Sequence, residues 1–203
     1  MKQLIIISLA AAFITGCETA PGWKRQSFAF SLPADPPATN ACDRVVALNR
    51  VSISPTFQSR SFTYRTGENS YEQDPYAGFV VPPERALAES IRASMRVGGV
   101  FGRIVEPGSG ITPGVVVEAS IIELYGDFRQ TARPVATMGI HFLCYAIQEG
   151  EPGRIVFDRY FLQETTLAQK TPGALMAAWD EDLRQIMNQI NSEYAKTNST
   201  GRY

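Results

Sequence analysis

The chain has 203 residues, of which 44% are hydrophobic and 19% are charged, and its 19 Lys and Arg residues nearly balance 20 Asp and Glu residues. This length and apolar content suffice for one globular domain with a buried core. The near-neutral charge argues against the strongly basic surface by which most nucleic-acid-binding domains attract their partner, so we expect no nucleic-acid partner.

The first sixteen residues have the pattern of a secretory signal peptide. Lys2 is followed by an apolar run at 4–13, which is too short to span a bilayer. The sequence Ile-Thr-Gly-Cys at 14–17 resembles the bacterial lipobox, in which the cysteine thiol receives diacylglycerol and the new amino terminus receives a fatty acid such as palmitate. We therefore predict a signal peptide at 1–16, lipidation of Cys17 and export to a membrane surface. The alternative is an ordinary cleaved signal peptide with an unrelated cysteine.

A short tether is expected between the lipid and the folded domain. Residues 17–25 are mostly polar and include Pro21 and Gly22. Eight extended residues reach about 25 Å, so the domain is expected to stay close to its membrane. A single domain at 26–196 and a flexible tail at 197–203 complete the predicted organisation.

The first half of the domain is predicted to form strands. Apolar residues alternate with small ones at 28–32, which indicates a first strand that ends at the proline cluster 33–37. A second strand is expected at 44–53, where β-branched residues gather. The segments 61–66 and 69–74 flank Gly-Glu and predict a hairpin.

An amphipathic helix is predicted next, followed by a short strand and a loop. Pro82 and Pro83 suit a helix start, and Gly98 and Gly99 suit its end. A short strand at 100–105 and a loop rich in glycine and proline at 107–114 should follow.

Three long strands and a second helix are predicted to complete the chain. The strands at 115–128, 135–148 and 154–165 are joined by turns and are expected to form an antiparallel meander. Thr171 offers a helix N-cap and Pro172 suits the first turn of a helix whose apolar stripe should pack on the sheet. The predicted fold class is therefore α+β, with a mostly antiparallel sheet and two amphipathic helices packed on it.

Two cysteines remain once Cys17 is assigned to lipid. Cys42 precedes one predicted strand and Cys144 lies inside another. An exported protein meets an oxidising compartment, so a Cys42–Cys144 disulfide is one expectation and two unpaired thiols are the other.

Few residues are suited to catalysis. His141 is the single histidine, and its spacing from Cys144 places the two side chains on opposite faces of a strand. The sequence lacks a P-loop, a dinucleotide-binding glycine motif and a Gly-x-Ser-x-Gly elbow. We therefore expect no metal, no cofactor and no catalytic residue.

Carboxylates provide the one catalytic alternative. Glu118, Glu123 and Asp127 lie on one predicted strand, and paired acids are the machinery of glycoside hydrolysis. The simpler interpretation is cross-strand pairing with arginines such as Arg129 and Arg159. The chain is accordingly interpreted as a non-enzyme.

Several motifs together resemble a known family. They are the lipobox, Ser-Arg-Ser-Phe-Thr-Tyr-Arg-Thr at 59–66, Tyr-Glu-Gln-Asp-Pro-Tyr at 71–76, Glu-Leu-Tyr-Gly-Asp-Phe-Arg at 123–129 and Ala-Ala-Trp at 177–179. Over about residues 26 to 195 the chain resembles the ABC-type transport auxiliary lipoproteins. The resemblance implies a lipoprotein that serves a transporter built from an ATPase, a permease and a mammalian-cell-entry-type protein. Such transporters move lipids or other hydrophobic compounds across the periplasm.

The resemblance implies a docking or adaptor role, with direct contact to lipid cargo left open. Glu18, rather than Asp, follows the cysteine and favours the outer membrane, with the domain facing the periplasm. We place the partner-binding surface on the hairpin, at Arg60, Tyr64, Arg65 and Tyr71, because arginine and tyrosine are enriched at interface centres. A solvated hairpin is the alternative for these residues. The alternative function is a periplasmic lipoprotein regulator that activates a cell-wall synthase.

Overall fold

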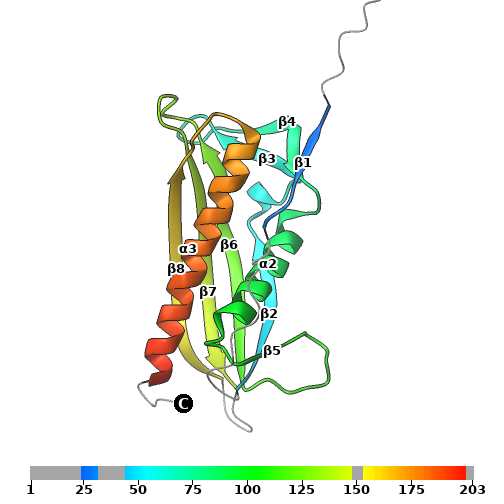
Figure 1. The fold of residues 1–203 in the computed structure, drawn as a ribbon, viewed down its shortest axis with the longest axis vertical. Coiled ribbons are helices and arrows are strands. Elements are labelled where there is room, and N and C mark those ends of the chain that lie inside the picture. Colours follow the sequence, from blue (N-terminus) through cyan, green and yellow to red (C-terminus); the bar gives the residue numbers. More distant parts are fainter. Residues whose placement is uncertain (1–23, 32–43, 148–152, 200–203) are drawn as a thin grey trace, which may run out of the picture.

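The computed structural model describes residues 24–31, 44–147 and 153–199 as a sheet with helices packed on one face (Figure 1). This arrangement confirms the predicted α+β class. The elements in chain order are β1 (Gln26–Phe28), β2 (Val45–Ile53), the 3-10 turn η1 (Pro55–Phe57), β3 (Ser61–Arg65), β4 (Tyr71–Phe79), α2 (Pro83–Gly98), β5 (Arg103–Val105), β6 (Val115–Asp127), β7 (Val135–Ala146), β8 (Arg154–Thr166) and α3 (Pro172–Ser199).

The sheet is mixed rather than uniformly antiparallel. The predicted meander is confirmed, since β6 pairs antiparallel with β7 and β7 pairs antiparallel with β8 over almost their full lengths. The opposite edge of β6 is shared by β2 and β3, and both run parallel to it. A chain that leaves β2 must cross over through the hairpin and α2 before it returns as β6, and such crossovers place strands in parallel.

The hairpin of β3 and β4 is confirmed, but β4 is longer than expected. It continues past Pro75 to Phe79. Proline lacks an N–H, and the carboxylate of Asp74 accepts the backbone N–H groups of Tyr76 and Ala77 at 2.7 and 2.9 Å. The ladder is therefore interrupted at Pro75 and resumes beyond it.

The first strand is shorter and earlier than the pattern at 28–32 predicts. β1 spans Gln26–Phe28 and runs parallel to β4, with Ser27 opposite Gly78. Phe30 lies beyond the strand, is buried and stacks on Phe79. The alternation therefore reflects apolar side chains that pack into the core before and after the end of the strand. Extended backbone outside the ladder also turns alternate side chains to the same side.

Helix α2 begins and ends where the sequence predicts. Pro83 occupies its first turn, and Gly99 ends it in the left-handed conformation at φ 67°. The strand expected at 100–105 is reduced to β5. Gly102 at φ 78° turns the chain, and Phe101 is fully buried in a stack on Tyr194 instead of joining the ladder.

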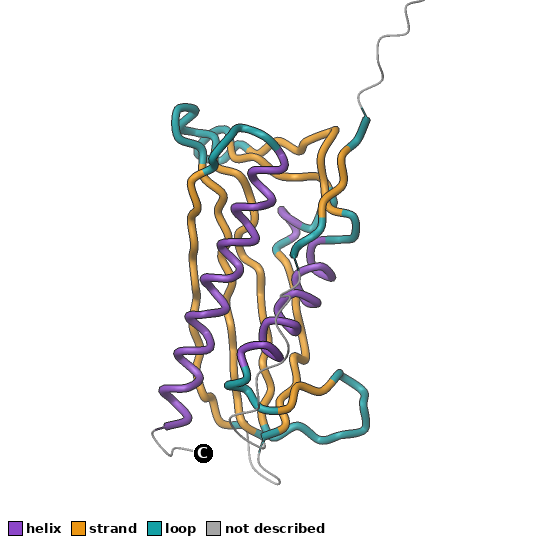
Figure 2. Tube along the Cα trace, viewed as in Figure 1, coloured by secondary structure: helices purple, strands orange, loops and turns teal. Residues whose placement is uncertain are grey.

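Helix α3 runs along β7 and β8 and closes the core (Figure 2). Thr171 caps it as predicted, since its Oγ1 accepts the N–H of Ala174 at 3.2 Å. The predicted apolar stripe is buried, and Trp179 at its centre contacts the rings of Phe62 and Phe79. The tail predicted from residue 197 is wrong in part, because the helix continues to residue 199 and Thr197 Oγ1 donates to the carbonyl of Glu193.

Candidate functional site

The four hairpin residues predicted as one docking surface lie in three places. Arg65 and Tyr71 are paired across the hairpin on the sheet face that carries no α-helix, which we call the open sheet face. Tyr64 points to the helix side, where its ring packs edge-on against Phe128. Arg60 lies at the other end of β3 and donates to the carbonyl oxygens of Phe79 and Val80.

Arg65 and Tyr71 belong to an aromatic cluster at one end of the open sheet face. The Arg65 guanidinium lies 5.9 and 5.8 Å from the ring centres of Tyr71 and Tyr125, and Phe57 packs against both tyrosines. Arg65 also donates to the carbonyls of Gly67 and Glu68, which holds its side chain in place. The cluster is rigid and presents Tyr71 to solvent.

Tyr64 is a structural residue of the hairpin. Its hydroxyl donates to Asp74 at 2.6 Å, and burial together with this carboxylate raises the pKa of the Tyr64 phenol above its usual range. The same Asp74 accepts the backbone N–H groups that follow Pro75. The hydrogen bond from Tyr64 therefore connects the interruption of β4 to the core.

The three acids of β6 all lie on the open sheet face, and each is held by a neighbour. Glu118 accepts from Tyr145 at 3.3 Å. The pairing register of β6 shifts between Ile121 and Glu123, and this bulge keeps Glu123 and Asp127 on the same face as Glu118.

Asp127 pairs with Arg129, but this pair is local because Arg129 follows Asp127 by two residues, so the predicted cross-strand pairing of the acids with arginines is wrong. Arg129 forms a hydrogen-bonded ion pair with Asp127 at 2.6 Å and lowers the pKa of that carboxyl. Glu123 accepts instead from Tyr160 at 2.6 Å. Arg159 does not join these acids, because it lies opposite Phe142, whose side chain is buried on the helix side of the sheet.

Tyr160 reaches Glu123 across a glycine. The two residues belong to β8 and β6, and Gly139 of β7 lies between them. A Cβ at Gly139 would lie 2.2 Å from the Tyr160 hydroxyl, so the missing side chain makes room for the bond. Sequence reasoning missed Tyr160 and Tyr125, although the alternation of the long strands already places them beside the acids.

His141 and Cys144 lie on opposite faces, as predicted. His141 Nε2 contacts Asp158 on the open sheet face. Cys144 is a free thiol buried in the core, and burial raises its pKa to about 12. The unpaired alternative therefore holds at Cys144, and the disulfide has no support. Cys42 and Cys17 lie outside the described residues.

An apolar patch occupies the open sheet face between these polar pairs. Ile122, Ile155, Tyr160 and Leu162 are 46, 59, 46 and 45% exposed. Tyr160 and Leu162 lie opposite His141 and Gly139 in the ladder, which puts them on the same face as the acids of β6. Exposed apolar side chains on a solvent-facing sheet are typical of interaction surfaces. We call these four residues the open-face patch.

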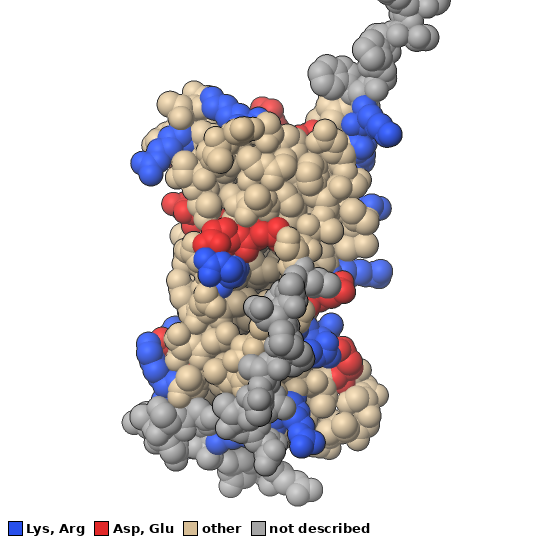
Figure 3. Space-filling view, viewed as in Figure 1, with Lys and Arg blue, Asp and Glu red and all other residues tan. Residues whose placement is uncertain are grey.

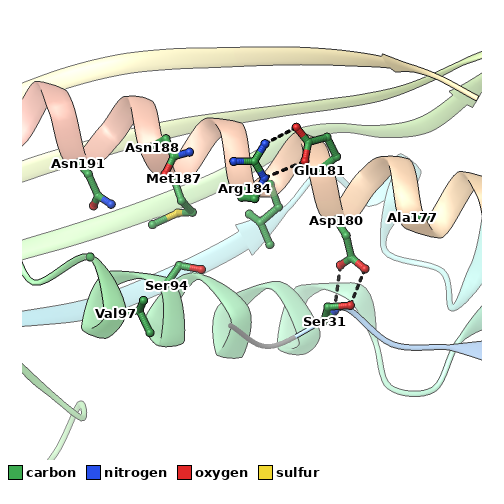
Figure 4. A pocket seen from close by; sticks show the side chains of 12 residues that line it. Ser31, Ser94, Val97, Ala177, Asp180, Glu181, Arg184, Met187, Asn188 and Asn191 are labelled. Atoms are coloured by element: carbon green, nitrogen blue, oxygen red, sulfur yellow. Dashed lines mark hydrogen bonds and ion pairs between the residues drawn. The ribbon is translucent and has the colours of Figure 1, made fainter. Parts of the chain in front are cut away.

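The opposite side of the molecule has a groove between α2 and α3. Its volume is about 560 Å³, and Val97, Leu183 and Met187 supply apolar walls beside polar residues such as Asn188 (Figure 4). Asp180 closes one end by accepting from the backbone N–H and the hydroxyl of Ser31 at 2.9 and 2.8 Å. Acidic and basic side chains meet in the middle of this face (Figure 3), and Asp180, Glu181 and Arg184 belong to the lining of the groove.

The described segments contain neither a spanning helix nor a metal-binding cluster. None of the helices at 55–57, 83–98 and 172–199 is long and apolar enough to cross a membrane. Among the residues with described positions, no three His, Cys, Asp or Glu side chains gather closely enough to hold a metal ion.

The comparisons with known proteins show a similarity of fold. A scan against protein-family models and a search of curated proteins find no match. The crystal structure of protein XCC0632 from Xanthomonas campestris, described by family model DUF330, is similar with a TM-score of 0.73 at 17% identity, covering 87% of this chain and 98% of that chain. A second crystal structure, of an uncharacterized protein, has a TM-score of 0.67 at 11% identity and covers 84 and 98% of the two chains. The chain thus shares the architecture of both proteins over almost their whole lengths.

Proposed function

We propose that the chain is a membrane-anchored auxiliary lipoprotein of an ABC-type transporter of the mammalian-cell-entry kind, which moves lipids or other hydrophobic compounds across the periplasm. The domain acts as a docking or adaptor subunit at the outer membrane and is not an enzyme. One observation carries the proposal, namely the open-face patch beside the aromatic cluster of Arg65, Tyr71 and Tyr125. Exposed aromatic and aliphatic side chains on a rigid sheet are suited to protein contact.

The state of the acids supports a docking role. Glycoside hydrolysis requires two carboxyl groups that face a substrate from opposite sides. Glu123 is instead bonded to Tyr160 and Asp127 to Arg129. Asp127 lines a hollow of about 600 Å³ whose lining does not include Glu123, so the two carboxyl groups do not face one site. The Glu123–Tyr160 bond joins β6 to β8, and the Asp127–Arg129 pair holds the chain at the end of β6.

Replacement of Cys17 by Ser is expected to release the protein from the membrane. Two or three acyl chains anchor a protein almost permanently, whereas the serine variant has no thiol to receive diacylglycerol. The measurement is the distribution of the protein between the membrane and soluble fractions of its host, with a Cys144→Ser variant as control. A Cys17→Ser protein of unchanged mobility that stays with the membrane would contradict the anchor.

Replacement of Ile155 by Glu is expected to abolish co-purification of the transporter subunit while leaving the fold intact. Ile155 is 59% exposed, so a charge there costs little stability, but it is disfavoured in an apolar contact. The measurement is affinity purification from host membranes followed by identification of the bound proteins. Gln189→Glu, which adds the same charge to an exposed position of α3, is the matched control.

Two outcomes would contradict the docking proposal. One is an equal yield of the mammalian-cell-entry-type protein with the Ile155→Glu and Gln189→Glu variants. The other is recovery of a cell-wall synthase in place of any transporter component, which would favour the regulator instead.

A further inference from the structure

A second polar site lies where β1 joins the hairpin. Arg25, Ser27, Ser59, Arg60 and Ser61 line a hollow of about 440 Å³ on the outer edge of the sheet. Two arginines and three serines therefore line it, and no described acidic residue belongs to its lining. Guanidinium and hydroxyl donors are the groups that bind phosphate oxygens.

The hollow is built by the register of three strands. Ser27 of β1 lies opposite Gly78 of β4, and Gly78 lies opposite Ser61 of β3, so their side-chain positions share one face. Gly78 has no side chain, which lets the Arg25 guanidinium pass over β4. A Cβ there would lie 3.0 Å from Arg25 Nη2 and 2.2 Å from the backbone oxygen of Arg60. Arg25 then donates to Ser61 Oγ at 3.3 Å.

Exposed apolar residues lie beside the hollow. Arg60 donates to the carbonyl oxygens of Phe79 and Val80, which fixes the backbone where β4 ends. Val80 and Val81 are 47 and 41% exposed, and Tyr76 of the same strand is also exposed. Basic groups beside exposed aliphatic and aromatic side chains are the combination found in surfaces that lie on lipid headgroups.

The position of the hollow in the chain relates it to the predicted anchor. Arg25 follows Cys17 by eight residues, a length that spans about 25 Å when extended. Basic side chains project at the margin of the molecule beside β1, where the described chain begins (Figure 3). A lipid on Cys17 would therefore keep this edge within about 25 Å of the bilayer.

We infer that the hollow of Arg25 and Arg60, with its rim of Tyr76, Val80 and Val81, binds the phosphate headgroups of an anionic phospholipid surface. The inference rests on the proposed function, because it takes the Cys17 anchor as the reason that a bilayer is near. The lipid anchor and the hollow have different roles at the membrane. The acyl chains hold the protein at the membrane, and the hollow orients the domain on the bilayer.

The test uses the mature chain 17–203 with Cys17→Ser, so that no acyl chain contributes to binding. It is sedimented with vesicles of phosphatidylcholine alone and with vesicles that also contain phosphatidylglycerol. We expect binding to the anionic vesicles, weakened by salt, and little binding to phosphatidylcholine. Arg25→Gln should weaken the binding about fivefold, as one basic residue near such a surface contributes. Val81→Ser should weaken it as well.

Arg133→Gln is the matched control, since it removes the same charge from an exposed arginine in the loop between β6 and β7. An equal loss with Arg25→Gln and Arg133→Gln would overturn the inference, because binding would then depend on overall charge. Failure to prefer anionic vesicles would overturn it too. Neither result depends on whether Cys17 carries lipid or which protein co-purifies, so the inference and the proposed function fail separately.

Discussion

Replacement of Trp179 by Ala is expected to lower the free energy of unfolding by about 3–5 kcal/mol. The side chain is fully buried where α3 meets the sheet, in edge contact with Phe62 at 5.0 Å and stacked on Phe79 at 5.6 Å. The alanine leaves a cavity between the last helix and the first strands, which the surrounding rings fill only in part. Urea unfolding followed by far-UV circular dichroism measures the loss.

Trp179→Phe is the matched control for this prediction. Phenylalanine keeps an aromatic ring against Phe62 and Phe79 and removes an indole N–H that has no hydrogen-bond acceptor among the described residues. Its loss of stability should therefore be well below that of Trp179→Ala. If the two variants unfold at the same urea concentration, Trp179 does not organise the contact of α3 with the sheet.

Because of the Asp182 carboxyl, we expect the free energy of unfolding to fall as the pH rises from about 4 to about 7. The carboxyl is completely buried between α3 and β8, where Thr165 Oγ1 donates to it at 2.6 Å. Burial raises its pKa from 3.8 to about 7. In this pH range the folded state holds a proton that the unfolded state has lost, so stability falls with pH. A difference of about three pKa units corresponds to about 4 kcal/mol.

Asp182→Asn tests this pH dependence. The amide oxygen still accepts from Thr165, but the side chain no longer titrates. The difference in unfolding free energy between the wild-type protein and this variant should therefore change by about 4 kcal/mol between pH 4 and pH 8, in favour of the variant at high pH. Glu193→Gln, at a half-buried position of the same helix, should leave the wild-type profile intact. A constant difference between wild type and Asp182→Asn would show that Asp182 titrates normally.

The open-face patch illustrates how much of the site the sequence could predict. The alternation in 115–128, 135–148 and 154–165 predicts long strands with two distinct faces, and it already puts Glu123 and Asp127 on one of them. The predicted pairing of Arg159 with these acids is wrong because the ladder register between β7 and β8, which the alternation of a single strand does not specify, places Arg159 opposite buried Phe142.

Local chemistry explains why most elements were predictable. Proline in the first turn, glycine at the left-handed end and a threonine cap act over a few residues, so Pro83, Gly99 and Thr171 mark their helices wherever these lie in the fold. Lipidation of Cys17 is a prediction of the same local kind, since it depends on four consecutive residues.

The sequence by itself determined the α+β class, the two amphipathic helices, the antiparallel meander and the opposite directions of His141 and Cys144. Only the tertiary structure decided that β2 and β3 share one edge of β6, that Arg65 meets Tyr125, and that Arg25 crosses Gly78 to reach Ser61. The reason is the distance along the chain over which each kind of signal acts. Caps and alternation report a residue's immediate neighbours, whereas strand order and register depend on contacts between residues tens of positions apart, and no local pattern encodes them.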